Sequence, residues 1–132
     1  MAVLHRVIVG IGSNAADREA AVAKACAMLA ARFSDFRASS IYTTPAEGSC
    51  AGAPDYCNAV ALFSTDSECE TLERFFKGME TDFGRTPECK TFGLIPLDID
   101  VVVWDDRILR PRDMARDYMR IGLRQLGETS FL

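Results

Sequence analysis

The chain of 132 residues alternates β-prone runs with two segments of helical periodicity. The β-prone runs occupy residues 7–11, 36–43, 56–63 and 97–104, where β-branched and aromatic side chains gather. Between the first and second runs, and again between the third and fourth, apolar residues recur every three or four positions, as on one face of a helix. The order strand, helix, strand, strand, helix, strand permits only a few layered arrangements.

The two helical segments each carry one apolar face. In the first segment this face consists of Val22, Cys26, Leu29 and Phe33. In the second it consists of Cys69, Leu72, Phe75, Phe76, Met79 and Phe83. Asn14 or Asp17 is the candidate N-cap of the first helix. Before the second helix, Ser67 and Glu70 have the spacing of a capping box, and Gly84 ends this helix. The segment order predicts an α/β (α+β) fold, a ferredoxin-like β-α-β-β-α-β sandwich in which an antiparallel sheet carries both helices on one face. A turn at residues 105–106 and helical character in residues 114–126 follow the last strand.

Composition agrees with one folded domain over residues 1–132, because 48% of the residues are hydrophobic and 26% are charged. The formal net charge of −4 disfavours a nucleic-acid partner, whose phosphates attract basic surfaces. No apolar run is long enough for a membrane span or for the core of a signal peptide, so we expect a cytoplasmic protein.

The cysteines and the single histidine limit the chemistry that the chain can perform. Five cysteines at irregular spacing favour reduced thiols over a disulfide framework. A zinc site of the usual spacing is unsupported, and His5 before the first strand is a poor partner for a catalytic cysteine.

Two aspartates, Asp98 and Asp100, open the last β-prone run. Aspartate is depleted in strands, and a spacing of two places both carboxylates on the same face. Two neighbouring carboxylates repel each other, and a hard cation such as Mg²⁺ relieves this repulsion. The alternative interpretation is a polar, solvent-facing edge at the start of the strand.

Two further segments allow both a functional and a structural interpretation. Residues 10–14, Gly-Ile-Gly-Ser-Asn, follow the first strand as a phosphate-binding loop would. They lack the third glycine of the dinucleotide-binding motif and the lysine of the P-loop, which favours a tight turn with a helix cap. Residues 45–54 form a long loop, and long ordered loops are often functional. Tyr56 and Asn58 follow it, and they could stack on a heterocycle and bind its edge, or serve as a core tyrosine and a strand entry.

Taken together and in this order, five short motifs resemble the 6-hydroxymethyl-7,8-dihydropterin pyrophosphokinases of folate biosynthesis. The motifs are Gly-Ser-Asn at 12–14, Ser-x-Tyr-x-Thr-Pro at 40–45, Asp-Tyr-x-Asn at 55–58, Glu80 with Gly84-Arg85, and Leu-Asp-Ile-Asp at 97–100. The resemblance implies a ferredoxin-like fold and the transfer of pyrophosphate from ATP to the pterin hydroxyl, which gives pterin diphosphate and AMP. It also implies small-molecule partners only, with ATP as co-substrate.

The resemblance assigns a role to each candidate site residue. The implied catalytic residues are Asp98, Asp100 and Arg85. The two aspartates are also the implied ligands of a pair of Mg²⁺ ions. The implied pterin-binding residues are Thr44, Pro45, Tyr56, Asn58, Phe92 and Leu123. The implied nucleotide-binding residues are Glu80, Arg85, Lys90, Ile99 and Arg120.

The chain departs from the family pattern in its basic residues. Of the arginines in the loop before the aspartate pair, only Arg85 remains; Thr91 and Ile95 occupy two of the other positions, and Lys90 is a candidate partial replacement. The family tail carries a histidine and an arginine, whereas here Arg120 or Arg116 is the nearest basic candidate. Phe92 stands at a tryptophan position, Leu123 at an aromatic one, and the C-terminal part is shorter than usual.

Three functions therefore remain open. The first is an active pyrophosphokinase with a rearranged phosphate clamp. The second is a catalytically weakened or inactive paralogue that binds a pterin-like ring or a nucleotide. The third is an interaction module without a ligand, which the ordered motifs disfavour. The sequence leaves the oligomeric state open.

Overall fold

The computed structural model describes residues 3–45 and 55–132. The strands are β1 His5–Ser13, β2 Ser34–Ala38, β3 Tyr42–Thr44, β4 Tyr56–Thr65, β5 Asp98–Trp104 and β6 Arg107–Ile108. The α-helices are α1 Arg18–Arg32, α2 Cys69–Asp82, α3 Pro111–Met114 and α4 Asp117–Leu126. Two 3₁₀ helices complete the description, η1 Pro87–Phe92 and η2 Thr129–Phe131.

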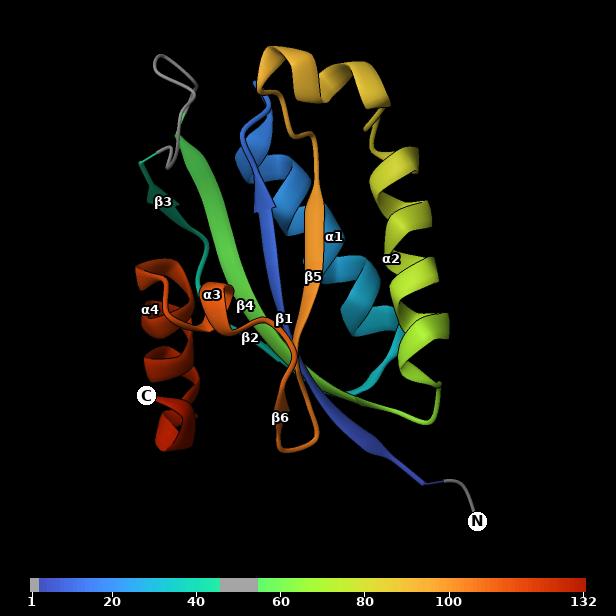
Figure 1. Ribbon diagram of the computed structural model, residues 1–132, viewed down its shortest axis with the longest axis vertical. Coiled ribbons are helices and arrows are strands. Elements are labelled where there is room, and N and C mark those ends of the chain that lie inside the picture. Colours follow the sequence, from blue (N-terminus) through green and yellow to red (C-terminus); the bar gives the residue numbers. More distant parts are fainter. Residues whose placement is uncertain (1–2, 46–54) are drawn as a thin grey trace.

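The six strands form one antiparallel sheet in the order β2-β4-β1-β5-β6, with β3 also paired to β4 (Figure 1). When β2 and β3 are counted as one interrupted strand, this is the strand order of a ferredoxin-like sandwich. The fold class predicted from the sequence is therefore confirmed. At one end of the central strand, Gly12 of β1 lies between Asn58 of β4 and Asp98 of β5.

The strand predicted over residues 36–43 is wrong in its continuity, because it divides into β2 and β3. Ser39 interrupts it: its backbone N–H donates to the carbonyl of Val60, and its hydroxyl accepts from the Val60 N–H. The Ser39 side chain thus takes the place of a backbone carbonyl in the ladder. The next residue turns away, since the Ser40 N–H donates to the side chain of Gln125 in α4.

Of the two candidate caps of α1, only Asp17 stands at the N-cap position, and the capping box predicted for α2 is wrong. Asn14 lies before the start of α1, and its side chain binds the segment that precedes β5. Asp17 stands at the N-cap position but makes no side-chain cap hydrogen bond. The N-cap of α2 is Glu68 rather than Ser67, and it also lacks a side-chain cap bond.

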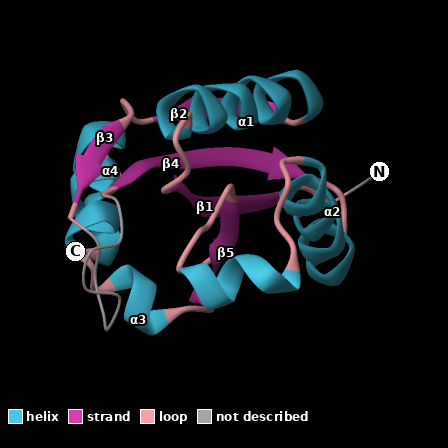
Figure 2. Ribbon diagram, turned by 90° about the horizontal axis from the view of Figure 1, so that it is seen from above, coloured by secondary structure: helices cyan, strands magenta, loops and turns pink. Residues whose placement is uncertain are grey.

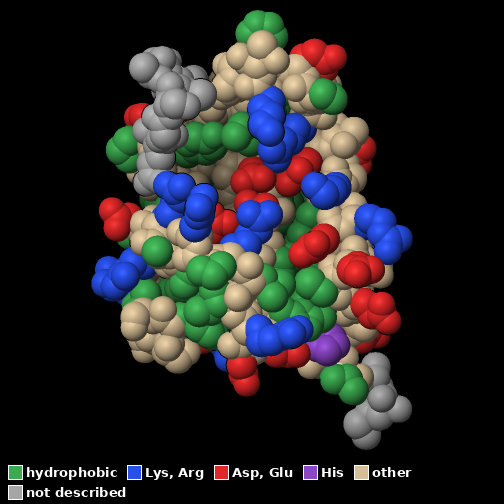
Figure 3. All heavy atoms as spheres, viewed as in Figure 1, with side chains coloured by type: hydrophobic (Ala, Val, Ile, Leu, Met, Phe, Trp, Pro, Cys, Tyr) green, Lys and Arg blue, Asp and Glu red, His purple; other side chains and the backbone are tan. Residues whose placement is uncertain are grey.

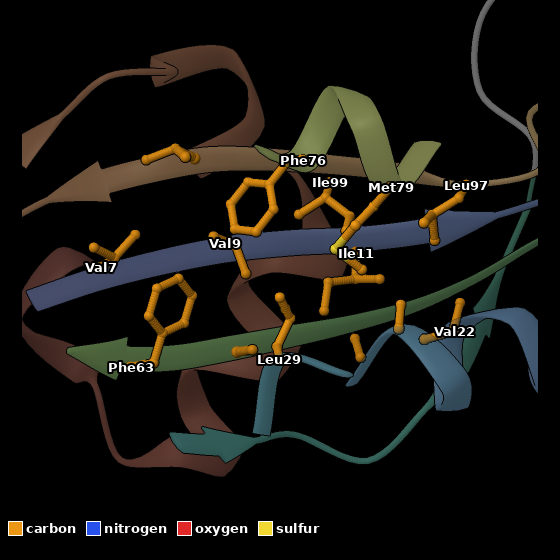
Figure 4. Close-up of a cluster of buried hydrophobic side chains, with 14 of the residues drawn as sticks. Val7, Val9, Ile11, Val22, Leu29, Phe63, Phe76, Met79, Leu97 and Ile99 are labelled. Carbon is orange, nitrogen blue, oxygen red and sulfur yellow. The ribbon is translucent and has the colours of Figure 1, made fainter. Parts of the chain in front are cut away.

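The larger core lies between the sheet and the helices α1 and α2 (Figure 4). Alternate residues of the strands face it, as the period of two requires. Aromatic rings occupy part of it, where Phe33 stacks on Phe63 with centroids 4.3 Å apart and Phe76 meets Phe63 edge to face. The two amphipathic segments recognised in the sequence therefore cover one face, as predicted.

The C-terminal part covers the opposite face of the sheet with α3 and α4 (Figures 1 and 2). The second core consists of Ile8, Val60, Leu62, Val102, Val103, Met114, Met119, Leu123 and Leu126. The segment order of the sequence predicts helices on one face only, so this second layer is an addition to the prediction.

Helix α4 lies very close to β4 at Gly122. A Cβ atom at this position would lie 2.5 Å from the Cβ of Val60. The hydroxyl of Tyr42 donates to the carbonyl of Tyr118 in the first turn of α4. Burial raises the pKa of Tyr42 to about 12, so the hydroxyl stays protonated and remains a donor.

The described cysteines, Cys26, Cys57, Cys69 and Cys89, are free thiols, and Cys50 lies outside the described residues. Over residues 3–45 and 55–132, no helix has both the length and the apolar character that crossing a membrane requires.

Candidate active site

The candidate site is built around the first residues of β5. Ile99 and Val101 face the larger core, so the alternate residues Asp98 and Asp100 face the opposite side. Across the ladder, Asp98 pairs with Gly12 and Asp100 with Gly10. These β1 partners have no side chains, and both glycines and both carboxylates line the same open cavity.

The glycines of β1 also allow two other side chains to approach. A Cβ on Gly10 would lie 3.2 Å from the hydroxyl oxygen of Tyr118, and a Cβ on Gly12 would lie 3.1 Å from Oδ1 of Asn58. Both glycines lie inside the strand. The tight turn favoured for residues 10–14 is therefore wrong, and these glycines form the floor of a cavity.

A first cavity of about 250 Å³ opens over this floor. It is lined by Gly10, Ile11, Gly12, Thr44, Pro45, Tyr56, Asn58, Ile95, Asp98, Asp100, Asp113, Arg116 and Tyr118. Four of the predicted pterin-binding residues are brought together here by β3, β4 and the residue after β3. The amide of Asn58 donates to the Thr44 hydroxyl across the β3–β4 pair. Most of the long loop assigned to residues 45–54 lies outside the described residues.

A second cavity of about 470 Å³ lies between α2, β5 and the chain before α3. It is lined by Glu73, Lys77, Glu80, Arg85, Asp98, Ile99, Asp100, Val101 and Arg110. Unlike the first cavity, it contains no aromatic residue among those described, and it is mostly charged. Asp98 and Asp100 line both cavities, so the acidic pair forms the boundary between them.

Figure 3 shows acidic side chains in the hollow upper part of this face, with Lys and Arg side chains around them. Arg85 lies 3.0 Å from Asp98, and Arg110 lies 3.3 Å from Asp100. Burial raises the pKa of Asp100 to about 8; the neighbouring Asp98 carboxylate also raises it, and Arg110 opposes both effects. A cation beside this pair would favour the ionised form of both groups.

Glu80 of α2 completes this cluster. One oxygen of its carboxylate lies 3.1 Å from Arg85, and the other accepts a hydrogen bond from the Ile99 N–H at 3.0 Å. The pKa of Glu80 is raised above its ordinary value, because the effect of burial outweighs the Ile99 hydrogen bond and Arg85, which both lower it. Glu80 therefore joins α2 to the strand that carries the acidic pair.

The acidic pair suits Mg²⁺ in charge and donor type. Mg²⁺ prefers carboxylate oxygens, commonly takes only one or two from the protein, and obtains its other ligands from water and substrate phosphates. Among the described residues, no group of three or more His, Cys, Asp or Glu side chains is placed to hold a metal. The protein thus offers Asp98 and Asp100 with open space beside them, rather than a closed cage.

Three residues of the C-terminal part line the cavities without having been predicted: Arg110, Asp113 and Tyr118. Arg116, one of the two candidate replacements for the tail arginine of the family, lines the first cavity. Asn14 supports the wall that contains Ile95. The hydrophobic pattern of residues 114–126 could have indicated that Tyr118 faces the sheet, since this pattern shows which face of α4 packs there.

Four predicted site residues line neither cavity. Lys90 is exposed on η1, as is Phe92, whose exposed fraction is 80%. Arg120 is half-buried elsewhere on α4. Leu123, predicted at a ring-stacking position, is fully buried in the second core, and Tyr118, in the first turn of the same helix, is the α4 residue beside the cavity.

Comparison with protein families supplies an independent result. Residues 8–128 match the family model described as 7,8-dihydro-6-hydroxymethylpterin-pyrophosphokinase. No curated protein matches the chain with significant sequence similarity. The matched range includes every residue that lines the two cavities. The chain therefore belongs to the 7,8-dihydro-6-hydroxymethylpterin-pyrophosphokinase family.

Proposed function

We propose that the protein transfers a pyrophosphate group from ATP to 6-hydroxymethyl-7,8-dihydropterin, in folate biosynthesis. The pterin hydroxyl oxygen forms a bond to the β-phosphorus, the bond between the β-phosphorus and the α,β-bridging oxygen breaks, and AMP leaves while the hydroxyl proton is released. The observation that carries the proposal is that two cavities of different chemistry share one pair of aspartates. A reaction between two ligands requires such a shared boundary.

The first cavity has the chemistry of a site for a flat, polar ring. Tyr56 and Tyr118 provide aromatic surface, and Asn58 and Thr44 provide an amide and a hydroxyl that can bind the nitrogen-rich edge of a pterin. Burial and nearby carboxylates raise the pKa of Tyr118, so its hydroxyl stays neutral and can donate a hydrogen bond. The ring would then lie with its hydroxymethyl group toward Asp98 and Asp100.

The second cavity has the chemistry of a site for a polyphosphate. Lys77, Arg85 and Arg110 line it, and guanidinium groups bind phosphate oxygens in a forked geometry. Arg85 is held by Glu80 and Asp98, so its position is fixed before a ligand arrives. Glu80 and the backbone of Ile99 lie on the same side, in agreement with the implied nucleotide-binding roles.

Asp98 and Asp100 would hold Mg²⁺ at the boundary, where the metal supplies charge neutralisation and orientation for the phosphates. The aspartates are on a strand of the sheet rather than on a loop, so their separation is set by the strand geometry. Arg85 and Arg110 each keep one of the carboxylates in place.

A binding function without turnover is the second candidate, and one observation favours it. Ile95 occupies the position of a family arginine and lines the first cavity, where an aliphatic side chain cannot stabilise phosphate charge. A phosphate-binding arginine changes the rate of phosphoryl transfer by about 10³–10⁵-fold. The protein in this case would bind the pterin and the nucleotide but turn over slowly or not at all.

One experiment distinguishes these functions. The protein is incubated with Mg²⁺, ATP and 6-hydroxymethyl-7,8-dihydropterin, and AMP is followed by chromatography. AMP formation that disappears in Asp98→Ala and persists in Asp66→Ala, an exposed carboxylate that lines neither cavity, supports the enzyme. Absence of AMP together with calorimetric binding of the pterin supports the binding function, and absence of both contradicts the proposal.

A further inference from the structure

The segment between α2 and β5 is attached to the rest of the protein at its two ends by different residues. Arg85 holds the beginning, through Glu80 and Asp98, on the side of the second cavity. Asn14 holds the end, at residues 93–95. Ile95, at this end, lines the first cavity but not the second.

Asn14 makes three hydrogen bonds to this end of the segment. Its backbone N–H donates to the Ile95 carbonyl at 3.0 Å. Its side-chain Oδ1 accepts from the Ile95 N–H at 2.6 Å, and its Nδ2 donates to the Gly93 carbonyl at 2.7 Å. Asn14 is 1% exposed, so water cannot replace these partners.

These bonds continue the sheet where its ladder ends. The last residue pair between β1 and β5 is Gly12 with Asp98, and beyond it the strands no longer pair. Asn14 extends the connection by offering a side-chain donor and acceptor as well as its backbone N–H. Asparagine suits this position because aspartate lacks the donor and leucine lacks both groups.

The backbone of Ile95 is therefore held by Asn14. Its two backbone polar groups both bind Asn14, and Gly93, with a φ of 65°, provides the left-handed turn that leads from η1 into this segment. On the far side of the cavity lie Thr44 and Asn58, from β3 and β4. The distance across the cavity thus depends on how firmly Asn14 holds the segment.

We propose that Asn14 is a positioning residue for the first cavity: it sets the wall formed by Ile95 and so determines the affinity for the ring ligand, whereas the second cavity is held independently by Arg85. This inference rests on the proposed function, because it takes the ring ligand to be the pterin.

The test uses Asn14→Asp, which keeps the size but replaces the Nδ2 donor by an acceptor facing the Gly93 carbonyl. Ser13→Ala is the matched control, since Ser13 is fully buried next to Asn14. Among the hydrogen bonds described, its hydroxyl accepts only from the Ala15 N–H and makes none to residues 93–95. Two affinities are measured by calorimetry. The first is that of α,β-methylene-ATP with Mg²⁺, and the second is that of 6-hydroxymethylpterin for the protein saturated with this analogue.

We expect Asn14→Asp to weaken pterin binding by about tenfold or more, because a buried donor is lost and two acceptors face each other. The nucleotide analogue should bind within about threefold of the wild type, and Ser13→Ala should leave both affinities within the same range. Hydrogen exchange of the Ile95 amide should become faster in Asn14→Ala and not in Ser13→Ala, which reports on the attachment without any ligand.

Three results would overturn the inference. Equal pterin affinity in Asn14→Asp and wild type contradicts it while leaving the proposed function intact. Equal losses for both ligands indicate a general structural role instead. If the wild type binds the nucleotide analogue but no pterin, the proposed function fails together with the positioning role, even where hydrogen exchange shows that the attachment exists.

Discussion

The glycine in the middle of α4 allows the C-terminal helix to pack against the sheet, and replacing it by alanine tests this packing directly. In Gly122→Ala the new Cβ would lie 2.5 Å from the Cβ of Val60. Carbon atoms pack best at about 3.5–4.0 Å, and Cγ2 of Val60 would lie even nearer than its Cβ, so α4 has to move away from β4 by about 1–2 Å. Val60 is fully buried on a central strand and has no room to move.

The magnitude follows from two opposing effects. Overpacking a core costs about 1–3 kcal/mol, and replacing a helical glycine by alanine returns up to about 1 kcal/mol. We therefore expect Gly122→Ala to lower the free energy of unfolding by about 1–2 kcal/mol. Gly78→Ala in α2 is the matched control, since no atom lies within 4 Å of a Cβ added there, and we expect it to raise this free energy by up to about 1 kcal/mol.

Urea unfolding followed by circular dichroism measures both variants, and the midpoints should move in opposite directions. The reasoning is refuted if Gly122→Ala is as stable as the wild type, or if both variants move together. A second consequence concerns the site: Tyr118, in the first turn of the same helix, lines the first cavity, so Gly122→Ala should also weaken pterin binding whereas Gly78→Ala should not.

Three further predictions concern other parts of the molecule. Burial raises the pKa of the Tyr42 hydroxyl to about 12, so its contribution to the free energy of unfolding is fully present below pH ~10 and decreases as the pH rises toward 12. We expect the free energy of unfolding to fall less over this pH range in Tyr42→Phe than in the wild type, as urea unfolding at several alkaline pH values will show. Hydrogen bonds from Thr86 lower the pKa of the Cys89 thiol, so iodoacetamide should label Cys89 before the buried Cys57, as peptide mass spectrometry will show; the reverse order would contradict this. Phe63→Ala should lower the free energy of unfolding by about 3–5 kcal/mol in a urea titration, because Phe63 is fully buried between two rings, and a loss below about 1 kcal/mol would show that the core collapses to fill the space.

The fold was largely predictable because periodicity records which side of an element is buried. The apolar face of α2 follows directly from the spacing of its residues, and the two faces of β5 follow from alternation. The break between β2 and β3 was not predictable, because it depends on the Ser39 hydroxyl replacing a carbonyl of the ladder. Such a replacement requires a partner strand that is distant in sequence.

The candidate site was predictable where its residues lie on regular elements. Asp98 and Asp100 follow from a single strand, and both line the two cavities. Arg110 was not foreseen, because its place depends on the turn after β5. The Leu109 N–H donates to the Val102 carbonyl, which brings the next residue back to Asp100. The place of Tyr118 in the site likewise depends on where α4 packs on the sheet. The local sequence predicts which face of α4 is buried, but not this position.

The shared acidic pair makes the two cavities thermodynamically dependent on each other. A ligand that brings positive charge to Asp98 or Asp100 from one cavity changes the electrostatic free energy that a ligand in the other cavity encounters. Linkage requires this effect to be reciprocal, so the factor by which the first ligand changes the affinity of the second equals the factor in the opposite direction. Heterotropic cooperativity is thus a direct consequence of placing two carboxylates of one strand at the boundary between two binding sites.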